Sequence, residues 1–566
     1  MKKAPRVQVL LLLSVSACGV ACGDDEPQPD GGGGAGAGTT SVTTTASSGS
    51  GSGGGGGDSG LEIAWTPCPL SSDDAEGSEA LCATIPVPLD WNDPNGAKID
   101  FFVKKIPAEE QPARGQLWML NGGPGYSGAD FEGKVKAVTV DVYLPDHRGT
   151  GRSSRLGCPE QEADASPDGY WVNDAELAPC LDHMKIEWGD NVLGFTTTNA
   201  ARDVGEVIEA TRKADDKILV SGGSYGSMWA NRYLQIYPDQ SSGVVLDAFA
   251  VGLLLTRDDQ YFNELGQRWM DACGADPVCG AKLGPDPWGA MTAALGALES
   301  GGCPEILAQG WDRDELHLFW SFFFYTWEYR SLIAPMVYRI ARCEPRDVTA
   351  MQNLHDVFTQ PMAPTASQRF FSMLLSTHVM LSELWEDPPP TAAELEAYQS
   401  AANVAHGIAA PAQALYDAWP RYPQDAYAGG LADTDVPILM MRGEYDFIPM
   451  SAIEPAVEHF SSTGTFVEIP GSPHSPYSAP QAMGGPSCGT QILVQFFADP
   501  TATLDTSCTS EVAALPLVPS AQLSAAAFGV ADPWEGSPAS LAIQSGHGAI
   551  GRASAELARF RHTRGR

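Results

Sequence analysis

The chain of 566 residues carries 34 basic and 70 acidic side chains, which gives a formal net charge of −36. This balance argues against charge-driven binding to nucleic acid or to anionic lipid, because both need a basic surface. It favours solubility and substrates that are neutral or cationic.

The first 17 residues have the pattern of a bacterial lipoprotein signal peptide. A basic run at residues 1–6 precedes an apolar run at residues 7–17, which is too short to cross a membrane as a stable helix. Residues 15–18 read V-S-A-C and fit a lipobox, in which the cysteine is diacylated and becomes the mature N-terminus. We expect Cys18 to be the membrane anchor, with Cys22 as the alternative. The protein is then an extracytoplasmic lipoprotein, in the periplasm or on the cell surface; a soluble secreted product is the other interpretation.

Residues 18–60 consist mainly of Gly, Ser, Thr and Asp, with almost no apolar side chains. Such a segment cannot bury a core, so we expect a disordered, flexible tether. The chain that follows is long enough for one large sheet domain with an inserted segment.

A glycine-rich turn follows the predicted strand at residues 117–120. It reads N-G-G-P-G at residues 121–125. Backbone N–H groups of such a turn can approach a developing oxyanion without obstruction by side chains. We expect the N–H of Gly122 or Gly123 to form an oxyanion hole together with the N–H of Tyr225. A D-x-R-G-x-G-x-S segment at residues 146–153 is expected to be a structural turn.

A G-x-S-x-G motif lies at residues 222–226, between a predicted strand at residues 217–221 and an amphipathic helical pattern at residues 228–237. Strand, sharp turn and helix are the context of a nucleophile elbow, which exposes the serine hydroxyl above a sheet. The flanking glycines are required because a side chain there would collide with neighbouring elements. We therefore predict that Ser224 is a nucleophile. The alternative is a surface serine in a glycine-rich turn.

A nucleophilic serine needs a base and an orienting carboxylate, which follow it along the chain in the order acid, then histidine. His474 comes after a predicted strand at residues 465–469 and a P-G-S-P turn, where a catalytic imidazole is expected. The other candidates fit less well: His147 precedes the serine, His459 lies in a helical pattern, and His547 and His562 lie in the tail.

The acid is predicted one strand before the histidine. Residues 436–443 form an apolar run that leads into G-x-x-D, so Asp446 lies at the carboxyl edge of a strand. We expect Asp446 to accept a hydrogen bond from His474 Nδ1 and to stabilise the imidazolium that forms during attack. Glu444 is the alternative acid.

Together these motifs resemble the proline iminopeptidase and tripeptidyl aminopeptidase branch of the α/β-hydrolases, serine peptidase family S33. The resemblance covers about residues 61–510 and includes C-A-T-I-P-V-P-L-D-W at 82–91 and T-T-T-N-A-A-R-D at 196–203. Residues 488–508 are similar to the C-terminal region of the tripeptidyl aminopeptidase type. Two positions depart from the pattern. Asn121 stands where the iminopeptidases have histidine, and Pro473 stands where glycine usually precedes the catalytic histidine.

The resemblance implies an α/β fold with a mostly parallel central sheet flanked by helices and an inserted helical cap. We expect the core at residues 61–250 and 431–510, the cap at residues 251–430 and a C-terminal tail at residues 511–566. Helical patterns rich in aromatic residues at 316–327 and 368–375 agree with a cap.

The expected function is that of an exported serine hydrolase, an aminopeptidase that releases one N-terminal residue, of the proline type, or a tripeptide. Such an enzyme needs a carboxylate for the substrate's ammonium group. Glu383 is the first candidate and Glu328 the second, although each fits an ordinary salt-bridged residue as well. A carboxylesterase for small esters and a non-catalytic binding lipoprotein are the alternatives. The oligomeric state stays open.

Cysteine usage agrees with export. Beyond Cys18 and Cys22, ten of the 12 cysteines remain, and an even number in an exported chain favours disulfides. They fall into five pairs along the sequence, which does not by itself determine the connectivity: Cys68, Cys82, Cys158, Cys180, Cys273, Cys279, Cys303, Cys343, Cys488 and Cys508. No spacing is typical of a zinc site, so we expect no metal and no cofactor.

Overall fold

The computed structural model describes residues 61–135, 137–163, 166, 172, 174–359 and 365–536. The predicted signal peptide, Cys18, Cys22 and the tether lie outside the described residues, as does the tail beyond residue 536. In the described part, no helix combines the length and the apolar composition needed to cross a membrane.

The described strands form one sheet in the order β1-β2-β3-β5-β4-β6-β7-β8-β9. Pairing is antiparallel from β1 to β5 and parallel from β5 through to β9. The strands are β1 (Thr66–Cys68), β2 (Ala80–Pro88), β3 (Lys98–Ile106), β4 (Gly115–Leu120), β5 (Asp141–Pro145), β6 (Lys217–Gly223), β7 (Gly243–Asp247), β8 (Ile438–Gly443) and β9 (Gly464–Ile469).

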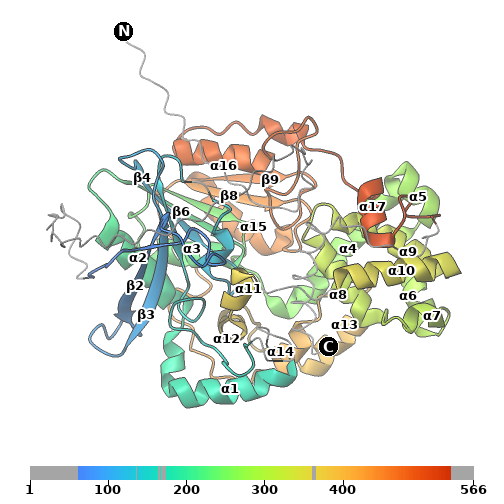
Figure 1. Ribbon diagram of the computed structural model, residues 1–566, viewed down its shortest axis with the longest axis horizontal. Coiled ribbons are helices and arrows are strands. Elements are labelled where there is room, and N and C mark those ends of the chain that lie inside the picture. The colour runs from blue at the N-terminus through green and yellow to red at the C-terminus, as the bar shows by residue number, and fades with distance from the viewer. Residues whose placement is uncertain are drawn as a thin grey trace, which may run out of the picture.

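Both faces of the parallel part are buried. In β4, Trp118 and Leu120 belong to one apolar cluster, whereas Leu117 and Met119 belong to another, because successive side chains point to opposite faces. The first cluster includes α2 and α3, and the second includes α16 (Figure 1). This double cover is what a parallel sheet requires. The helices outside the insertion are α1 (Asp174–Trp188), α2 (Thr197–Thr211), α3 (Tyr225–Ile236), α15 (Met450–His459), α16 (Cys488–Ala498) and α17 (Ala521–Phe528).

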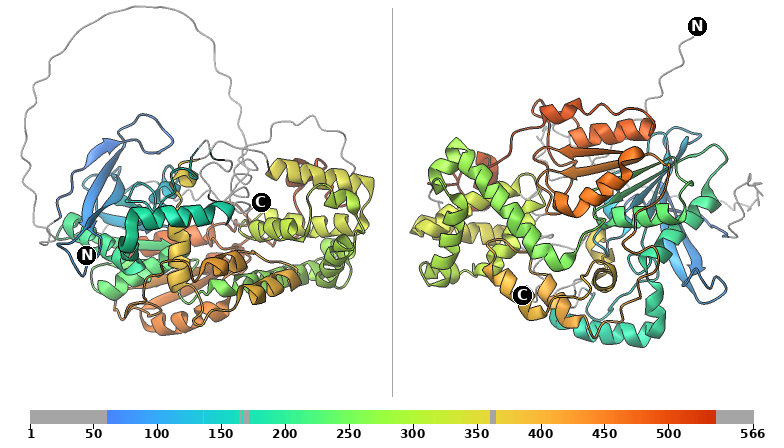
Figure 2. Two further views of the ribbon diagram at one scale, coloured as in Figure 1. Left: turned by 90° about the horizontal axis from the view of Figure 1, so that it is seen from below. Right: turned by 180° about the vertical axis from the view of Figure 1, so that it is seen from behind.

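A long helical insertion separates β7 from β8. Its described residues contain no strand, and α4 to α10 gather at the end of the molecule away from β2 and β3 (Figures 1 and 2). Its apolar core is continuous with that of the α3 face, so we call residues 251–430 the cap of a single domain. The cap helices are α4 (Asp258–Ala275), α5 (Pro277–Leu283), α6 (Pro287–Glu299), α7 (Pro304–Leu307), α8 (Arg313–Phe324), α9 (Ile333–Arg342), α10 (Pro345–Phe358), α11 (Ala366–Phe370), α12 (Met373–Glu383), α13 (Ala392–Ala401) and α14 (Ala409–Leu415).

Several helices begin where the sequence supplies a capping side chain. The Thr196 side chain accepts a hydrogen bond from the N–H of Asn199 at the start of α2. Thr391 and Glu394 form a reciprocal capping box at the start of α13. Such side chains satisfy N–H groups that have no partner within the helix.

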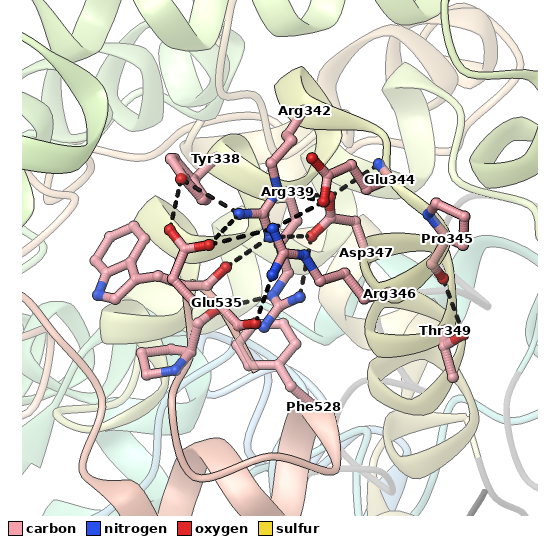
Figure 3. A network of polar contacts seen from close by, with 12 residues as sticks. Tyr338, Arg339, Arg342, Glu344, Pro345, Arg346, Asp347, Thr349, Phe528 and Glu535 are labelled. Carbon is pink, nitrogen blue, oxygen red and sulfur yellow. Dashed lines mark hydrogen bonds and ion pairs between the residues drawn. The ribbon is translucent and has the colours of Figure 1, made fainter. Parts of the chain in front are cut away.

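The segment after α16 leaves the core and ends on the cap. Here α17 packs against α10, and Glu535 forms an ion pair with Lys282 at 2.7 Å. Glu535 also pairs with Arg342 at 2.6 Å (Figure 3). Arg339 donates to the backbone carbonyl of Pro533 at 2.7 Å. We call residues 513–536 the strap, because they connect the core to the far side of the cap.

The ten cysteines of the described residues form five disulfides, and each disulfide joins two cysteines that are consecutive in the sequence. The pairs are Cys68–Cys82, Cys158–Cys180, Cys273–Cys279, Cys303–Cys343 and Cys488–Cys508. Three of them lie in the core and two in the cap, so neither part depends on a disulfide to the other.

Candidate active site

Ser224 occupies a strained turn between β6 and α3. Its backbone has φ 55° and ψ −126°, in the left-handed region that side chains rarely adopt. The Ser224 N–H donates to the carbonyl of Asp247 at 2.9 Å, and the Ser224 carbonyl accepts from the Ser227 hydroxyl at 2.6 Å. Both hydrogen bonds hold the strained backbone in place.

The two flanking glycines are required by close backbone contacts. A Cβ atom at Gly222 would collide with the carbonyl of Gly226, and a Cβ atom at Gly226 would collide with the carbonyl of Leu120. The turn therefore brings β6, the start of α3 and the end of β4 closer together than any other residue type allows.

Asp446 and His474 form a hydrogen-bonded pair at the carboxyl edge of the sheet. They follow β8 and β9, which are parallel neighbours, so their loops meet at the same edge. His474 Nδ1 lies 2.8 Å from Asp446 Oδ1, and that oxygen also accepts from the N–H of Ile448 at 3.0 Å. Because a carboxylate only accepts, Nδ1 carries the proton and Nε2 is left as the basic nitrogen. Glu444, the alternative acid, accepts instead from the N–H of Gly471 at 2.8 Å.

The pKa of His474 reflects two opposing effects. Burial lowers it, whereas the negative charge of Asp446 and the hydrogen bond to it raise it. The second effect is larger, so the pKa of His474 is raised above its ordinary value.

Ser224 and His474 both line a cavity of about 770 Å³ between the sheet edge and the cap. Among the described residues that line it there is no lysine or arginine, but there are four carboxyl side chains: Asp130, Asp247, Asp258 and Glu328. Burial raises the pKa of Asp130 and of Glu328, and raises that of Asp247 to about 7. The remaining wall is largely apolar, with Met228, Leu253, Phe322, Trp327, Met380 and Phe447 among its side chains.

Hydrogen bonding within the turn distinguishes the two glycines proposed for the oxyanion hole. Gly122 packs against the nucleophile, since a Cβ atom there would lie 2.9 Å from Ser224 Cβ, but its N–H donates to Asn121 Oδ1 at 2.8 Å. The Gly123 N–H donates no hydrogen bond among the described residues, so it is the available donor of the turn. Tyr225 is the first residue of α3. Its N–H belongs to the first turn of that helix, where N–H groups have no partner within the helix.

The two glutamates predicted to bind an ammonium group differ in their surroundings. Glu383 does not line the cavity: it forms a buried ion pair with Arg232 at 2.6 Å and accepts from the Tyr422 hydroxyl at 2.6 Å. The charge of Glu383 is therefore already neutralised by a neighbouring side chain. Glu328 does line the cavity, and it has no ion-pair partner among the described residues.

The D-x-R-G segment supports the wall of the site. Arg148 is fully buried and pairs with Asp203 at 2.6 Å. His147 Nε2 lies 3.2 Å from the Tyr225 hydroxyl, and burial lowers the pKa of His147 to about 3.

Asp247 lines the cavity but was not predicted from the sequence, although a carboxylate at the end of an apolar run marks the carboxyl end of a strand. Asp258, another residue of the cavity wall, was not predicted either, because no sequence motif marks it.

A sequence profile described as alpha/beta hydrolase fold matches residues 117–279. The serine protease Hip1 of Mycobacterium tuberculosis is 28% identical over 209 residues, which cover 33% of this chain and only 39% of the relative. Carboxylesterase B of the same species is 29% identical over 171 residues, which cover 26% of this chain and 32% of the relative.

Among solved structures, a proline iminopeptidase of Mycobacterium smegmatis aligns with a TM-score of 0.29 and 14% identity over 69% of this chain and 91% of that chain. The profile match and the observed sheet confirm the predicted α/β-hydrolase fold with its helical insertion. The chain has the α/β-hydrolase fold and is similar in sequence to proteins named as a serine protease and a carboxylesterase.

The backbone contact at Gly222 predicts a sharp difference between two glycine-to-alanine variants. Gly222→Ala should lower the free energy of unfolding by about 3 kcal/mol, because the added methyl group meets backbone that cannot yield. Gly296→Ala, in α6 with no atom within 4 Å of the added group, should stabilise by about 0.5–1 kcal/mol. Urea unfolding measures both, and similar midpoints for the two variants would contradict the contact.

The charge of Asp446 predicts a change in the titration of His474. In Asp446→Asn the charge of Asp446 is lost, and the charge of Asp247 is left to oppose burial, so the pKa of His474 should fall. NMR titration of the imidazole measures this, with the signal assigned from a His474→Gln variant. Glu444→Gln is the matched control and should leave the titration unchanged, because Glu444 bonds to Gly471 instead of the imidazole.

Proposed function

We propose that this α/β hydrolase is a serine aminopeptidase that releases an N-terminal residue, of the proline type, or a tripeptide through an acyl-enzyme. One observation carries the proposal: the cavity shared by Ser224 and His474 has four carboxyl side chains and, among its described lining residues, no lysine or arginine. Such a cavity favours a substrate with a free ammonium group and disfavours one with a free carboxylate nearby.

The proposed reaction uses the residues of the sheet edge. Ser224 Oγ attacks the scissile carbonyl while His474 Nε2 accepts its proton, and Asp446 stabilises the resulting imidazolium. The N–H groups of Tyr225 and Gly123 donate to the oxyanion. His474 then protonates the leaving amine, and water, activated by the same imidazole, hydrolyses the acyl-enzyme to restore Ser224.

We assign binding of the substrate's ammonium group to Glu328. Its side chain lines the cavity at the cap side and is half-buried without an ion-pair partner among the described residues. Burial raises the pKa of Glu328. A neighbouring cation favours the carboxylate, so binding of an ammonium group and ionisation of Glu328 reinforce each other.

A carboxylesterase on the same three residues is the second candidate. The largely apolar wall of the cavity suits an ester acyl group, and one relative carries the name Carboxylesterase B. A fold does not determine the substrate, so the two candidates differ only in whether a free ammonium group is needed.

Matched substrates separate these candidates. Purified residues 61–566 should cleave proline and tripeptide anilides with a free N-terminus, and should cleave the N-acetylated anilides at least tenfold more slowly. Ser224→Ala should reduce turnover by roughly 10⁶-fold. Rapid hydrolysis of short p-nitrophenyl esters with no anilide cleavage would instead assign a carboxylesterase.

Glu328→Gln tests the ammonium site within the same assay. It should lower kcat/KM for free anilides by about 10- to 100-fold, because one charged hydrogen bond is lost, and should leave ester turnover within about twofold. Glu383→Gln is the control: it disrupts the ion pair with Arg232 and should lower stability without changing the preference for free over acetylated substrates. An equal loss on all substrates in Glu328→Gln would remove Glu328 from the site.

We further propose that the protein is exported and anchored through Cys18. The support is the lipobox at residues 15–18 and the five disulfides, which form in oxidising compartments. Full-length protein made in a bacterium should partition into detergent, and Cys18→Ser should move it to the aqueous phase. Loss of partitioning in Cys22→Ser alone would make Cys22 the anchor, and an aqueous wild-type protein would refute the lipid anchor.

A further inference from the structure

Arg330 of the cap carries a buried charge that the reaction proposed above does not use. It lies in the short helix η4 (Tyr329–Leu332), and its side chain is 0% exposed. It forms no ion pair among the described residues, and its Nη1 has no hydrogen-bond partner there. Burial lowers the pKa of Arg330. The carboxyl groups of Glu328 and Glu444 act on this charge only from beyond ion-pair distance. A buried charge without a close counterion destabilises the folded state, so its position here points to another role.

Aromatic rings surround the Arg330 guanidinium and connect the cap to the acid loop. Its central carbon lies 4.8 Å from the ring centre of Trp269 and 4.7 Å from that of Trp327, both in the cap. The ring of Tyr445, at 5.6 Å, belongs to the residue directly before Asp446. Ring faces attract a cation, so the guanidinium attracts cap and acid loop together.

A hydrogen bond connects the same guanidinium to the histidine loop. Arg330 Nη2 donates to the carbonyl of Gly471 at 2.5 Å, three residues before His474. The N–H of Gly471 donates to Glu444 Oε2 at 2.8 Å, so both backbone polar groups of Gly471 are held. A Cβ atom on Gly471 would lie 2.9 Å from Leu515 of the strap.

The acid and histidine loops are also in direct contact. The N–H of Tyr445 donates to the carbonyl of Ser472 at 2.8 Å, and a Cβ atom at Gly443 would collide with the carbonyl of Pro473. A change at Arg330 therefore acts on both loops that carry the Asp446–His474 pair.

We propose that Arg330 is a positioning residue, through which the cap sets where the His474 imidazole stands relative to Ser224. This inference rests on the proposed role of His474 as the base. Arg330 does not line the cavity, so it acts through Gly471 and Tyr445 and not by touching the substrate. Arginine suits this position because its planar group stacks between rings while it donates at its edge.

Phosphonylation of Ser224 by a fluorophosphonate tests the proposal without a choice of peptide substrate. The rate constant, taken per titrated active site, should fall by roughly 10- to 100-fold in Arg330→Met, because a displaced imidazole removes the proton less effectively. Arg330→Lys keeps one donor but not the planar stacking, so its rate should lie between those of Arg330→Met and the wild type. It also provides the decisive rate if Arg330→Met does not fold.

The dependence on pH distinguishes positioning from a change in basicity. Above the pKa of His474 the phosphonylation rate constant reaches a plateau, and in the Arg330 variants this plateau should be lower than in the wild type. If the rate constant kept the wild-type plateau and only its midpoint moved to another pH, the proposal would be overturned.

Arg339→Met is the matched control. Arg339 is also a fully buried cap arginine, but it pairs with Asp347 at 3.0 Å, so its loss should lower stability and leave the rate unchanged.

The remaining outcomes are distinct. A wild-type rate per active site in the folded Arg330 variants would mean that Arg330 is only structural. Absence of labelling in the wild-type protein would instead refute Ser224 and His474 as a catalytic pair, and with it the proposed function.

Discussion

The close contact of three backbone segments around Ser224 is the constraint on which the rest of the site depends. The end of β4, the end of β6 and the start of α3 approach within a distance that only Gly222 and Gly226 allow. A serine in a left-handed conformation persists only where its surroundings hold it, and here the carbonyl of Asp247 and the side chain of Ser227 do so. The same approach brings Gly122 against Ser224 and places Tyr225 at the start of α3, so one packing arrangement positions the residues of the proposed site.

The cap is inserted between β7 and β8, but these two strands pair directly in the sheet. Parallel pairing of β7, β8 and β9 brings Asp247, Asp446 and His474 to one carboxyl edge, although 199 residues separate the first two. The cap then closes a cavity over this edge. Burial raises the pKa of three of its carboxyl groups, Asp130, Asp247 and Glu328, and a cation that entered the cavity would favour their ionised forms.

Cap and core are held together by buried polar contacts as well as by the shared apolar core. Arg330 reaches the two catalytic loops from the cap, Arg232 reaches Glu383 from the core, and the strap returns from the core to Arg339 and Arg342. The contacts of Arg330, Arg232 and Arg339 are specific in geometry, because these three guanidinium groups are buried and a buried charge tolerates few arrangements. We infer that they select one orientation of the cap, whereas the apolar core supplies most of the stability.

The sequence by itself determined what depends on local backbone and chain order. The cysteine count predicted disulfides but not their connectivity, which only the structure gives. The sequence did show the glycine spacing around Ser224 and the strand endings before Asp446 and His474, and the structure brings these residues together. It could not decide between Glu383 and Glu328, nor between Gly122 and Gly123, and it did not indicate Asp247, Asp258 or Arg330. Those outcomes depend on partners far away in the chain, such as Arg232, which lies 151 residues from Glu383. Local patterns reflect constraints within a few residues, whereas the free charge of a side chain depends on which distant segments fold against it.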